Sequence, residues 1–290
     1  MAEARVALVT GASRGAGAGI ARGLGELGYT VYVTGRTLSP GAAKGWDGSI
    51  LPGTVAETAA QVTALGGYGI PIICDHGNDE QVAQLFDTIR VDHGRLDLLV
   101  NNASYMHHQL IEKKPFWEKE LNAQLILDVG LRSAYVASWH AARLMTEQKS
   151  GLIGFVSSFG ADCYMHGPAY GAQKAGLDKL AHDMAFDLKD SGVISVSLWL
   201  GPQITERSEI ARQTNPEQYQ EFMANAENPE FSAHIFDAID RSTERETLSG
   251  QTLIGAEIAK TLGIKDRGHD RPSYRETLGT PRKKNTTAVY

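Results

Sequence analysis

The sequence predicts an α/β fold in which one doubly wound parallel sheet is covered by helices on both faces. Three observations support this prediction. Short apolar runs alternate with stretches of helical spacing, a glycine-rich turn follows the first apolar run, and no change of composition divides the series into two domains. Strands buried on both faces are continuous apolar runs, and right-handed crossovers join them into such a sheet.

The expected strands and helices follow one another in alternation. The expected strands span residues 5–11, 30–36, 69–75, 96–103, 151–158 and 194–201. The expected helices span residues 19–28, 55–66, 79–94, 125–148 and 170–192. A last edge strand is expected within residues 248–259. This order is typical of a single Rossmann-like domain.

The expected domain covers residues 1–265, and residues 266–290 follow it as a C-terminal tail. Within the domain, residues 206–246 are polar, helical in parts and lack a strand pattern. Ligands bind beyond the carboxyl ends of parallel strands, so this insertion is well placed to be a substrate lid. A packed pair of surface helices is the alternative. Acidic residues interrupt the basic residues of the tail, which favours a solvated tail over an interaction site.

The composition excludes several classes of function. The 290 residues include 28 basic and 34 acidic side chains, so the formal net charge is −6, which argues against nucleic-acid binding. Cys74 and Cys163 cannot build a disulfide framework, which fits a reducing cytoplasm, and both are expected to be small core residues. No apolar run approaches about 18 residues and no cleavable leader is recognisable, so we expect no membrane association. The adjacent His107 and His108 point apart on most backbones, so we expect no metal site.

The stretch TGASRGAGAG, residues 10–19, follows the first expected strand and opens the first expected helix. Gly11 permits a tight turn, Gly15 lets a ligand approach the backbone, and Gly17 lets the helix pack closely on the strand. The N-terminus of a helix also offers unpaired N–H groups and a partial positive charge. The pattern predicts binding of a dinucleotide diphosphate, and a purely structural glycine turn is the alternative.

Further motifs occur in a fixed order after this turn. Together with it they are T-G-x-x-x-G-x-G at 10–17, Asp75, N-N-A-S at 101–104 and Y-x-x-x-K at 170–174. Over about residues 5–260 the chain resembles the short-chain dehydrogenase/reductase family, with Ser104 in place of a glycine of that family. The stretches DVGLRSAYVASWHAARLM and GLIGFVSS resemble in particular the subgroup called dehydrogenase/reductase family member 1.

This resemblance implies an oxidoreductase that transfers hydride from NADPH to a ketone or aldehyde, or in reverse from the alcohol, with steroids and other bulky ketones among the candidate substrates. It also implies a homodimer or homotetramer assembled through two long helices. Asp75 corresponds to the acid that contacts the adenine amino group in the family. The carboxyl end of the sixth strand carries Gly201-Pro202 where the family has Pro-Gly, and Thr205 is placed to meet the cofactor.

Tyr170 and Lys174 are four residues apart, so on one helix they share a face. A free phenol, with a pKa of about 10, is a poor acid or base at neutral pH, and a nearby ammonium lowers that pKa. The resemblance implies that Tyr170 transfers the proton, that Lys174 also holds the nicotinamide ribose, and that a serine polarises the carbonyl. Counting from the glycine before the strand favours Ser158, whereas counting back from Tyr170 favours Ser157.

Arg36 ends the second expected strand, where an acid would select NAD. A guanidinium suits a 2′-phosphate, and Arg14 in the glycine turn can approach the same place, so NADP(H) is the expected cofactor. A solvated charge at the strand end is the alternative for Arg36. The candidate cofactor-binding residues are Gly11, Ser13, Arg14, Gly15, Ala16, Gly17, Arg36, Thr37, Asp75, His76, Asn102, Ala103, Ser104, Tyr170, Lys174, Gly201, Gln203 and Thr205.

One departure from the family pattern concerns the mechanism. Gly130 stands where many members have an asparagine in the long central helix, and glycine has no side-chain amide to offer. That asparagine helps to position a water in the proton relay to the lysine. A catalytically weak NADP(H) sensor of the same fold is therefore the alternative to an enzyme.

Overall fold

The computed structural model describes residues 4–45, 48–287 and 289. Its main feature is a seven-stranded sheet in the order β5-β2-β1-β6-β7-β8-β9, in which each neighbouring pair is parallel. The strands are β1 (Val6–Val9), β2 (Thr30–Gly35), β5 (Tyr68–Ile73), β6 (Leu98–Asn101), β7 (Gly151–Ser158), β8 (Val193–Leu200) and β9 (Thr252–Ile254). The predicted fold class, a doubly wound α/β domain, is confirmed.

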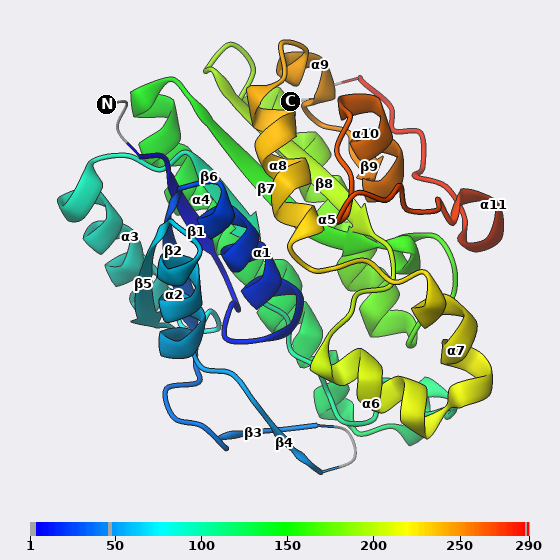
Figure 1. Ribbon diagram of the computed structural model, residues 1–290. Coiled ribbons are helices and arrows are strands. Elements are labelled where there is room, and N and C mark those ends of the chain that lie inside the picture. Colours follow the sequence, from blue (N-terminus) through cyan, green and yellow to red (C-terminus); the bar gives the residue numbers. More distant parts are fainter. Residues whose placement is uncertain (1–3, 46–47, 288, 290) are drawn as a thin grey trace.

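Helices cover both faces of the sheet (Figure 1). One apolar core lies between the sheet and α1, α2, α8 and α10, and the other lies between the sheet and α3, α4 and α5. These helices are α1 (Gly15–Glu26), α2 (Val55–Ala64), α3 (Asp79–His93), α4 (Ser133–Gln148), α5 (Pro168–Asp187), α8 (Phe231–Arg241) and α10 (Gly255–Leu262). The inner strands are therefore largely buried on both sides, as their continuous apolar sequences indicate, whereas the edge strand β5 is partly exposed.

Shorter elements lie in the connections. They are the hairpin β3 (Ala43–Lys44) and β4 (Ile50–Leu51), the single turns η1 (Phe116–Glu118), η2 (Leu121–Gln124) and η4 (Phe159–Ala161), the π-type segment η3 (Leu127–Arg132), and helices α6 (Glu206–Thr214), α7 (Pro216–Ala224), α9 (Arg245–Leu248) and α11 (Arg275–Leu278). Successive strands are added to one side of β1 up to β5 and to its other side from β6 onward, so the strand order reverses between β1 and β6. Ligand sites of doubly wound sheets lie beyond the carboxyl ends of the strands at such a point.

The predicted helix 125–148 is not continuous. Val129 and Gly130 have non-helical backbone angles, with φ of +153° at Gly130, and α4 begins only at Ser133. The Gly130 N–H donates to the Ser133 hydroxyl at 3.0 Å, and the Val129 carbonyl accepts from the Tyr105 N–H. Glycine favours this backbone region because it has no Cβ. Apolar spacing alone does not reveal such a break.

The insertion 206–246 divides into two parts with different surroundings. Helices α6 and α7 lie beyond the carboxyl ends of the strands, whereas α8 belongs to the apolar core (Figure 1). Helix α8 packs so closely on α1 that a Cβ at Gly23 would lie 2.7 Å from the Cβ of Ala233. The prediction of a lid is therefore wrong for residues 231–241. The polar residues of this stretch alternate with a buried apolar stripe that includes Ile235 and Phe236, and the sequence analysis did not recognise that stripe.

The C-terminal segment packs on the domain and is not a solvated tail. Figure 1 shows it in red, running beside α10 and β9. The Arg275 guanidinium pairs with Glu257 of α10 at 2.6 Å, and the Lys284 ammonium donates to the Thr252 hydroxyl of β9 at 2.8 Å. Leu278 reaches the pocket described below. The expectation of a solvated tail is wrong because its basic residues find specific partners on the domain.

The last predicted strand is also shorter than expected. Only Thr252–Ile254 form β9, and the chain then continues directly into α10. Cys74 is buried in the core as expected, whereas Cys163 is half-buried and lines the pocket. Within the described residues, no helix combines the length and apolar character needed to cross a bilayer.

Candidate active site

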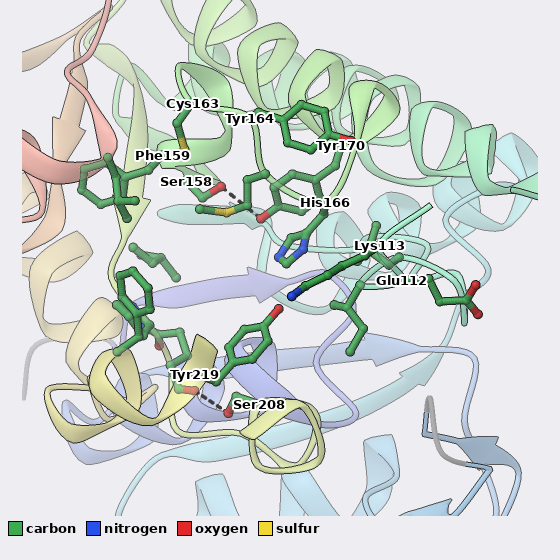
Figure 2. A pocket seen from close by; sticks show the side chains of 18 of the residues that line it. Glu112, Lys113, Ser158, Phe159, Cys163, Tyr164, His166, Tyr170, Ser208 and Tyr219 are labelled. Atoms are coloured by element: carbon green, nitrogen blue, oxygen red, sulfur yellow. Dashed lines mark hydrogen bonds between the residues drawn. The ribbon is translucent and has the colours of Figure 1, made fainter. Parts of the chain in front are cut away.

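A cavity of about 670 Å³ opens beyond the carboxyl ends of β7 and β8 (Figure 2). Its walls come from the ends of these strands, the loop after β6, helices α6 and α7, and the C-terminal segment. Apolar side chains form most of the lining, among them Leu110, Ile111, Phe159, Met165, Leu200, Phe222, Met223 and Leu278. Ser158 and Tyr170 are two of its polar lining residues. This is the form expected of a small-molecule site.

Ser158 and Tyr170 form the polar centre of this cavity. Ser158 is the last residue of β7, Tyr170 lies in the first turn of α5, and their hydroxyl oxygens are 3.0 Å apart. The phenol ring lies directly over Gly160, where a Cβ would approach the ring to 2.5 Å. Gly160 also donates its N–H to the Ser158 hydroxyl at 3.2 Å, which fixes the orientation of that side chain.

Ser157 points away from this pair. Successive residues of a strand face opposite sides of the sheet. The Ser157 hydroxyl is buried and donates to the main-chain carbonyl of Lys174 at 3.3 Å. Of the two serines left open by the sequence, only Ser158 lines the cavity and contacts Tyr170.

Lys174 lies one helical turn after Tyr170 and is buried. Its ammonium donates to the Val156 carbonyl at 3.1 Å and lies 5.4 Å from the centroid of the Tyr170 ring. Burial lowers the pKa of Lys174 to about 8, and burial raises the pKa of Tyr170, an effect that the hydrogen bond with Ser158 opposes. Burial therefore has a larger effect on the pKa of this phenol than the lowering expected from the ammonium, which is directed to a main-chain carbonyl. The phenol keeps its proton at neutral pH.

Asp178, which the sequence analysis missed, anchors the helix that carries these groups. It lies one turn after Lys174 and accepts hydrogen bonds from the Ser197 hydroxyl at 2.6 Å and the Trp199 indole N–H at 2.9 Å. Both partners belong to β8, so the buried carboxylate ties α5 to the sheet. Its position four residues after Lys174 was a usable signal, because this spacing places both side chains on one face of the expected helix.

The glycine turn contacts the end of β6. Gly11 has φ of +66°, and a Cβ there would lie 2.7 Å from the Cα of Ala103. A Cβ at Gly17 would lie 2.4 Å from the Asn102 side-chain nitrogen, which itself donates to the Thr10 carbonyl at 2.9 Å. The Thr10 hydroxyl accepts from the N–H groups of Asn102 and Ala103. The two motifs thus support one another as a single cradle at the N-terminus of α1.

The residues expected at an adenosine pocket lie at the ends of β2 and β5. The Arg14 guanidinium donates to the Thr37 hydroxyl at 3.1 Å and to the Gly53 carbonyl at 2.7 Å. The Arg36 side chain is 61% exposed and 4.0 Å from the Asp75 carboxylate, so it keeps donors for an anion.

His76, which was also expected to bind the cofactor, directs its side chain into the core. Its ring is buried, lies 2.8 Å from the Thr34 hydroxyl, and has its pKa lowered to about 4 by burial. The His76 side chain therefore belongs to the core, which leaves the main chain of this residue for a cofactor contact.

The loop after β8 is fixed by a second buried acid. Glu227 accepts from the Gly201 N–H at 3.1 Å and from the Gln203 side chain at 2.6 Å, and burial raises its pKa to about 7. Thr205 directly precedes α6 and caps it by accepting from the Ser208 N–H at 3.2 Å. The sequence analysis did not identify Glu227.

Two buried polar atoms, one in the loop after β6 and one in the loop after β8, suit a bound nucleotide. The Ser104 hydroxyl and the Gln203 side-chain oxygen are buried without a hydrogen-bond partner among the described residues. Buried polar atoms of this kind call for a ligand or water. Together with the N-terminus of α1 and the donors of the largely exposed Arg36 side chain, they fit a dinucleotide cofactor.

The comparisons with known proteins agree with this geometry. Residues 5–218 match the family model described as short chain dehydrogenase. The chain belongs to the short-chain dehydrogenase/reductase family. It is 38% identical to dehydrogenase/reductase SDR family member 1 of Mus musculus, over 91% of this chain and 83% of that protein. The corresponding protein of Homo sapiens is 37% identical, over 90% of this chain and 83% of that protein.

A solved member of the family also matches the structure. The crystal structure of a putative NAD(P)-dependent gluconate 5-dehydrogenase from Beutenbergia cavernae, with bound NADP, has a TM-score of 0.71 and 26% identity. The match covers 87% of this chain and 94% of that one. Short-chain dehydrogenase/reductase proteins bind nicotinamide cofactors and act on small molecules. The chain is accordingly an NAD(P)-dependent dehydrogenase or reductase.

Gly130, the departure from the family pattern, lies against the residue that precedes Lys174. A Cβ at position 130 would lie 3.0 Å from the side-chain nitrogen of Gln173. Gln173 is almost completely buried, and its side-chain oxygen has no hydrogen-bond partner among the described residues. A glutamine amide from α5 thus occupies the space into which a side chain at position 130 would project.

His107 and His108 lie in the loop after β6 and take no part in the Ser158–Tyr170 hydrogen bond. His107, His108 and Glu120 place one ligand atom each within 4.8 Å of one another. However, His107 Nδ1 accepts from the Gln109 N–H at 3.2 Å, so a neutral ring carries its proton on Nε2, facing Glu120 at 3.5 Å. A protonated ring nitrogen does not coordinate a metal, so this arrangement argues against an ion at the cluster. The absence of a metal site stays a prediction.

Proposed function

We propose that this protein is an NADP(H)-dependent carbonyl reductase, or alcohol dehydrogenase in the reverse direction. The observation that carries the proposal is the Ser158–Tyr170 pair, 3.0 Å apart, in an apolar cavity beside the buried Lys174. A protonated phenol and a second hydroxyl at one point suit a single carbonyl oxygen. A screen of ketones and aldehydes, followed by the absorbance of NADPH, tests this function.

The residues have separate tasks in this proposal. The bound cofactor supplies the hydride. Ser158 donates a hydrogen bond to the carbonyl oxygen of the substrate, and Tyr170 transfers its phenolic proton to that oxygen as the alcohol forms. In the reverse direction Tyr170 accepts the alcohol proton. Lys174, held by the Val156 carbonyl, places a positive charge near the phenol and stabilises its deprotonated form.

Selectivity for NADP(H) is expected to depend on Arg36. Replacing Arg36 with alanine removes charge-assisted hydrogen bonds to a 2′-phosphate, so KM for NADPH should rise by about tenfold to a hundredfold. KM for NADH should change little, since that cofactor carries a 2′-hydroxyl. Steady-state kinetics with both cofactors provides the comparison. An equal rise of KM for NADH and for NADPH would show that Arg36 does not bind the 2′-phosphate.

Glu206 is expected to oppose cofactor binding. Its carboxylate accepts from the Gly15 N–H at 3.2 Å, at the N-terminus of α1 where we place the diphosphate. Because carboxylate and diphosphate compete for one donor and repel one another, Glu206→Gln should lower the Kd for NADPH by about two- to fivefold. Fluorescence titration measures this change. Glu217→Gln, which removes an exposed charge from neighbouring α7, is the control, and equal effects of both variants would exclude the specific contact.

The second candidate is a catalytically weak NADP(H) sensor, for which the substitution at Gly130 is the favouring observation. Cofactor binding without turnover of any carbonyl compound in the same screen would favour it. For the assembly we propose a homodimer or homotetramer in the cytoplasm. Tyr135 and Trp139 of α4 are both about half exposed, and this apolar surface supports packing between copies.

A further inference from the structure

The lining of the cavity combines an apolar interior with an excess of positive charge. Its lysines outnumber its carboxylates, and the charged lining residues are Lys113, Lys114, Lys119 and Glu112. The whole chain, in contrast, has a formal net charge of −6. A local positive charge at a cavity of an acidic protein raises the concentration of anions there.

Two of these lysines have partners in the protein. The Lys114 ammonium pairs with the Glu112 carboxylate at 2.8 Å, which neutralises the one acid of the lining. The Lys119 ammonium donates to the Leu110 carbonyl at 3.2 Å. Lys113 forms no ion pair with the part of the chain that the structure describes. Its charge is therefore available to a molecule in the cavity.

The direction of the Lys113 side chain supports an interaction between its charge and a molecule in the cavity. Figure 2 shows this side chain extending into the cavity that Tyr219 and His166 also line. Burial lowers the pKa of His166 to about 4, so this ring is neutral at pH 7 and does not repel the ammonium. Lys113 and Tyr219 thus offer a cation and a hydroxyl in the cavity that the reacting pair also lines.

We propose that the substrate is an apolar carbonyl compound with an anionic group, such as a carboxylate, remote from the carbonyl, and that Lys113 binds this group. This rests on the function proposed above. Ser158 and Tyr170 take the carbonyl, the apolar walls take the hydrocarbon, and Lys113 takes the charge. An anion that enters an apolar cavity needs such a partner, because removing it from water is otherwise unfavourable.

The experiment compares a medium-chain oxo acid with its methyl ester, using NADPH and the full-length protein. Wild type should have the higher kcat/KM for the oxo acid. Lys113→Met should raise KM for the oxo acid by roughly three- to tenfold, with kcat and both constants for the ester unchanged. Lys113→Arg should restore the preference. Lys260→Met, an equal change of charge on the exposed surface of α10, should behave as wild type.

The outcomes separate this inference from the proposed function. Equal constants for oxo acid and ester in wild type, or an equal loss for both in Lys113→Met, would overturn the inference and leave the reductase intact. If neither compound is reduced, the proposed function fails. Calorimetry with the oxo acid and the NADPH-loaded protein then decides: weaker binding to Lys113→Met supports the anion site, and unchanged binding rejects it.

Discussion

Replacing Tyr170 with phenylalanine should lower kcat for carbonyl reduction by about 10²–10⁴-fold, the contribution typical of a positioned proton donor. The variant keeps the ring that packs over Gly160 and loses only the hydroxyl 3.0 Å from Ser158. Fold and cofactor binding should therefore remain. The measurements are kcat from NADPH absorbance and the Kd for NADPH from fluorescence.

Tyr219→Phe is the matched control for this prediction. It removes another phenolic hydroxyl that faces the same cavity, from α7. With a neutral ketone it should keep nearly full turnover. If Tyr170→Phe also kept its turnover, proton transfer by this phenol would be excluded, and if it lost NADPH binding as well, the role would be structural.

Ser158→Ala should lower kcat/KM by about 10²–10³-fold, as expected for the loss of one hydrogen-bond donor to a developing oxyanion. The alanine variant leaves the Tyr170 phenol without its hydroxyl partner and deprives the substrate oxygen of one of two contacts. Initial rates over a range of ketone concentrations measure the change.

Ser157→Ala provides an internal comparison for this second prediction. Its hydroxyl, one residue earlier, is buried and donates to the Lys174 carbonyl. Its loss should reduce the melting temperature slightly and leave kcat/KM within a small factor of wild type. The reverse pattern, with Ser157→Ala inactive and Ser158→Ala active, would contradict the assignment.

The overall fold was predictable because strand burial and helix periodicity depend on local sequence. Continuous apolar runs correctly indicated strands such as β7 and β8, which are buried on both faces. The errors concern features that depend on distant partners. The break at Gly130 requires contacts with Tyr105 and Gln173, and the packing of residues 266–287 requires Glu257 and Thr252. Apolar spacing carries no information about these contacts.

The site was predictable where one element supplies the chemistry. Tyr170 and Lys174 share the face of a single helix, so their spacing was sufficient. Ser157 and Ser158 face opposite sides of β7. To choose between them, one must know which side faces Tyr170 of α5, and the sequence does not show this. Asp178, Glu227 and Lys113 were not identified because each acts across elements, and the sequence does not show what an acid or a lysine faces.

The far end of the chain takes part in forming the cavity. Leu278 contributes to its wall, Tyr274 stacks edge-on with Phe159 beside Ser158, and Lys284 holds the segment against β9. A fusion partner or affinity tag joined directly to this end, or a shortened expression product, therefore alters the shape of the binding chamber itself. Exchange of residues 274–284 between paralogues offers a route to new ligand preferences that leaves the reacting groups untouched.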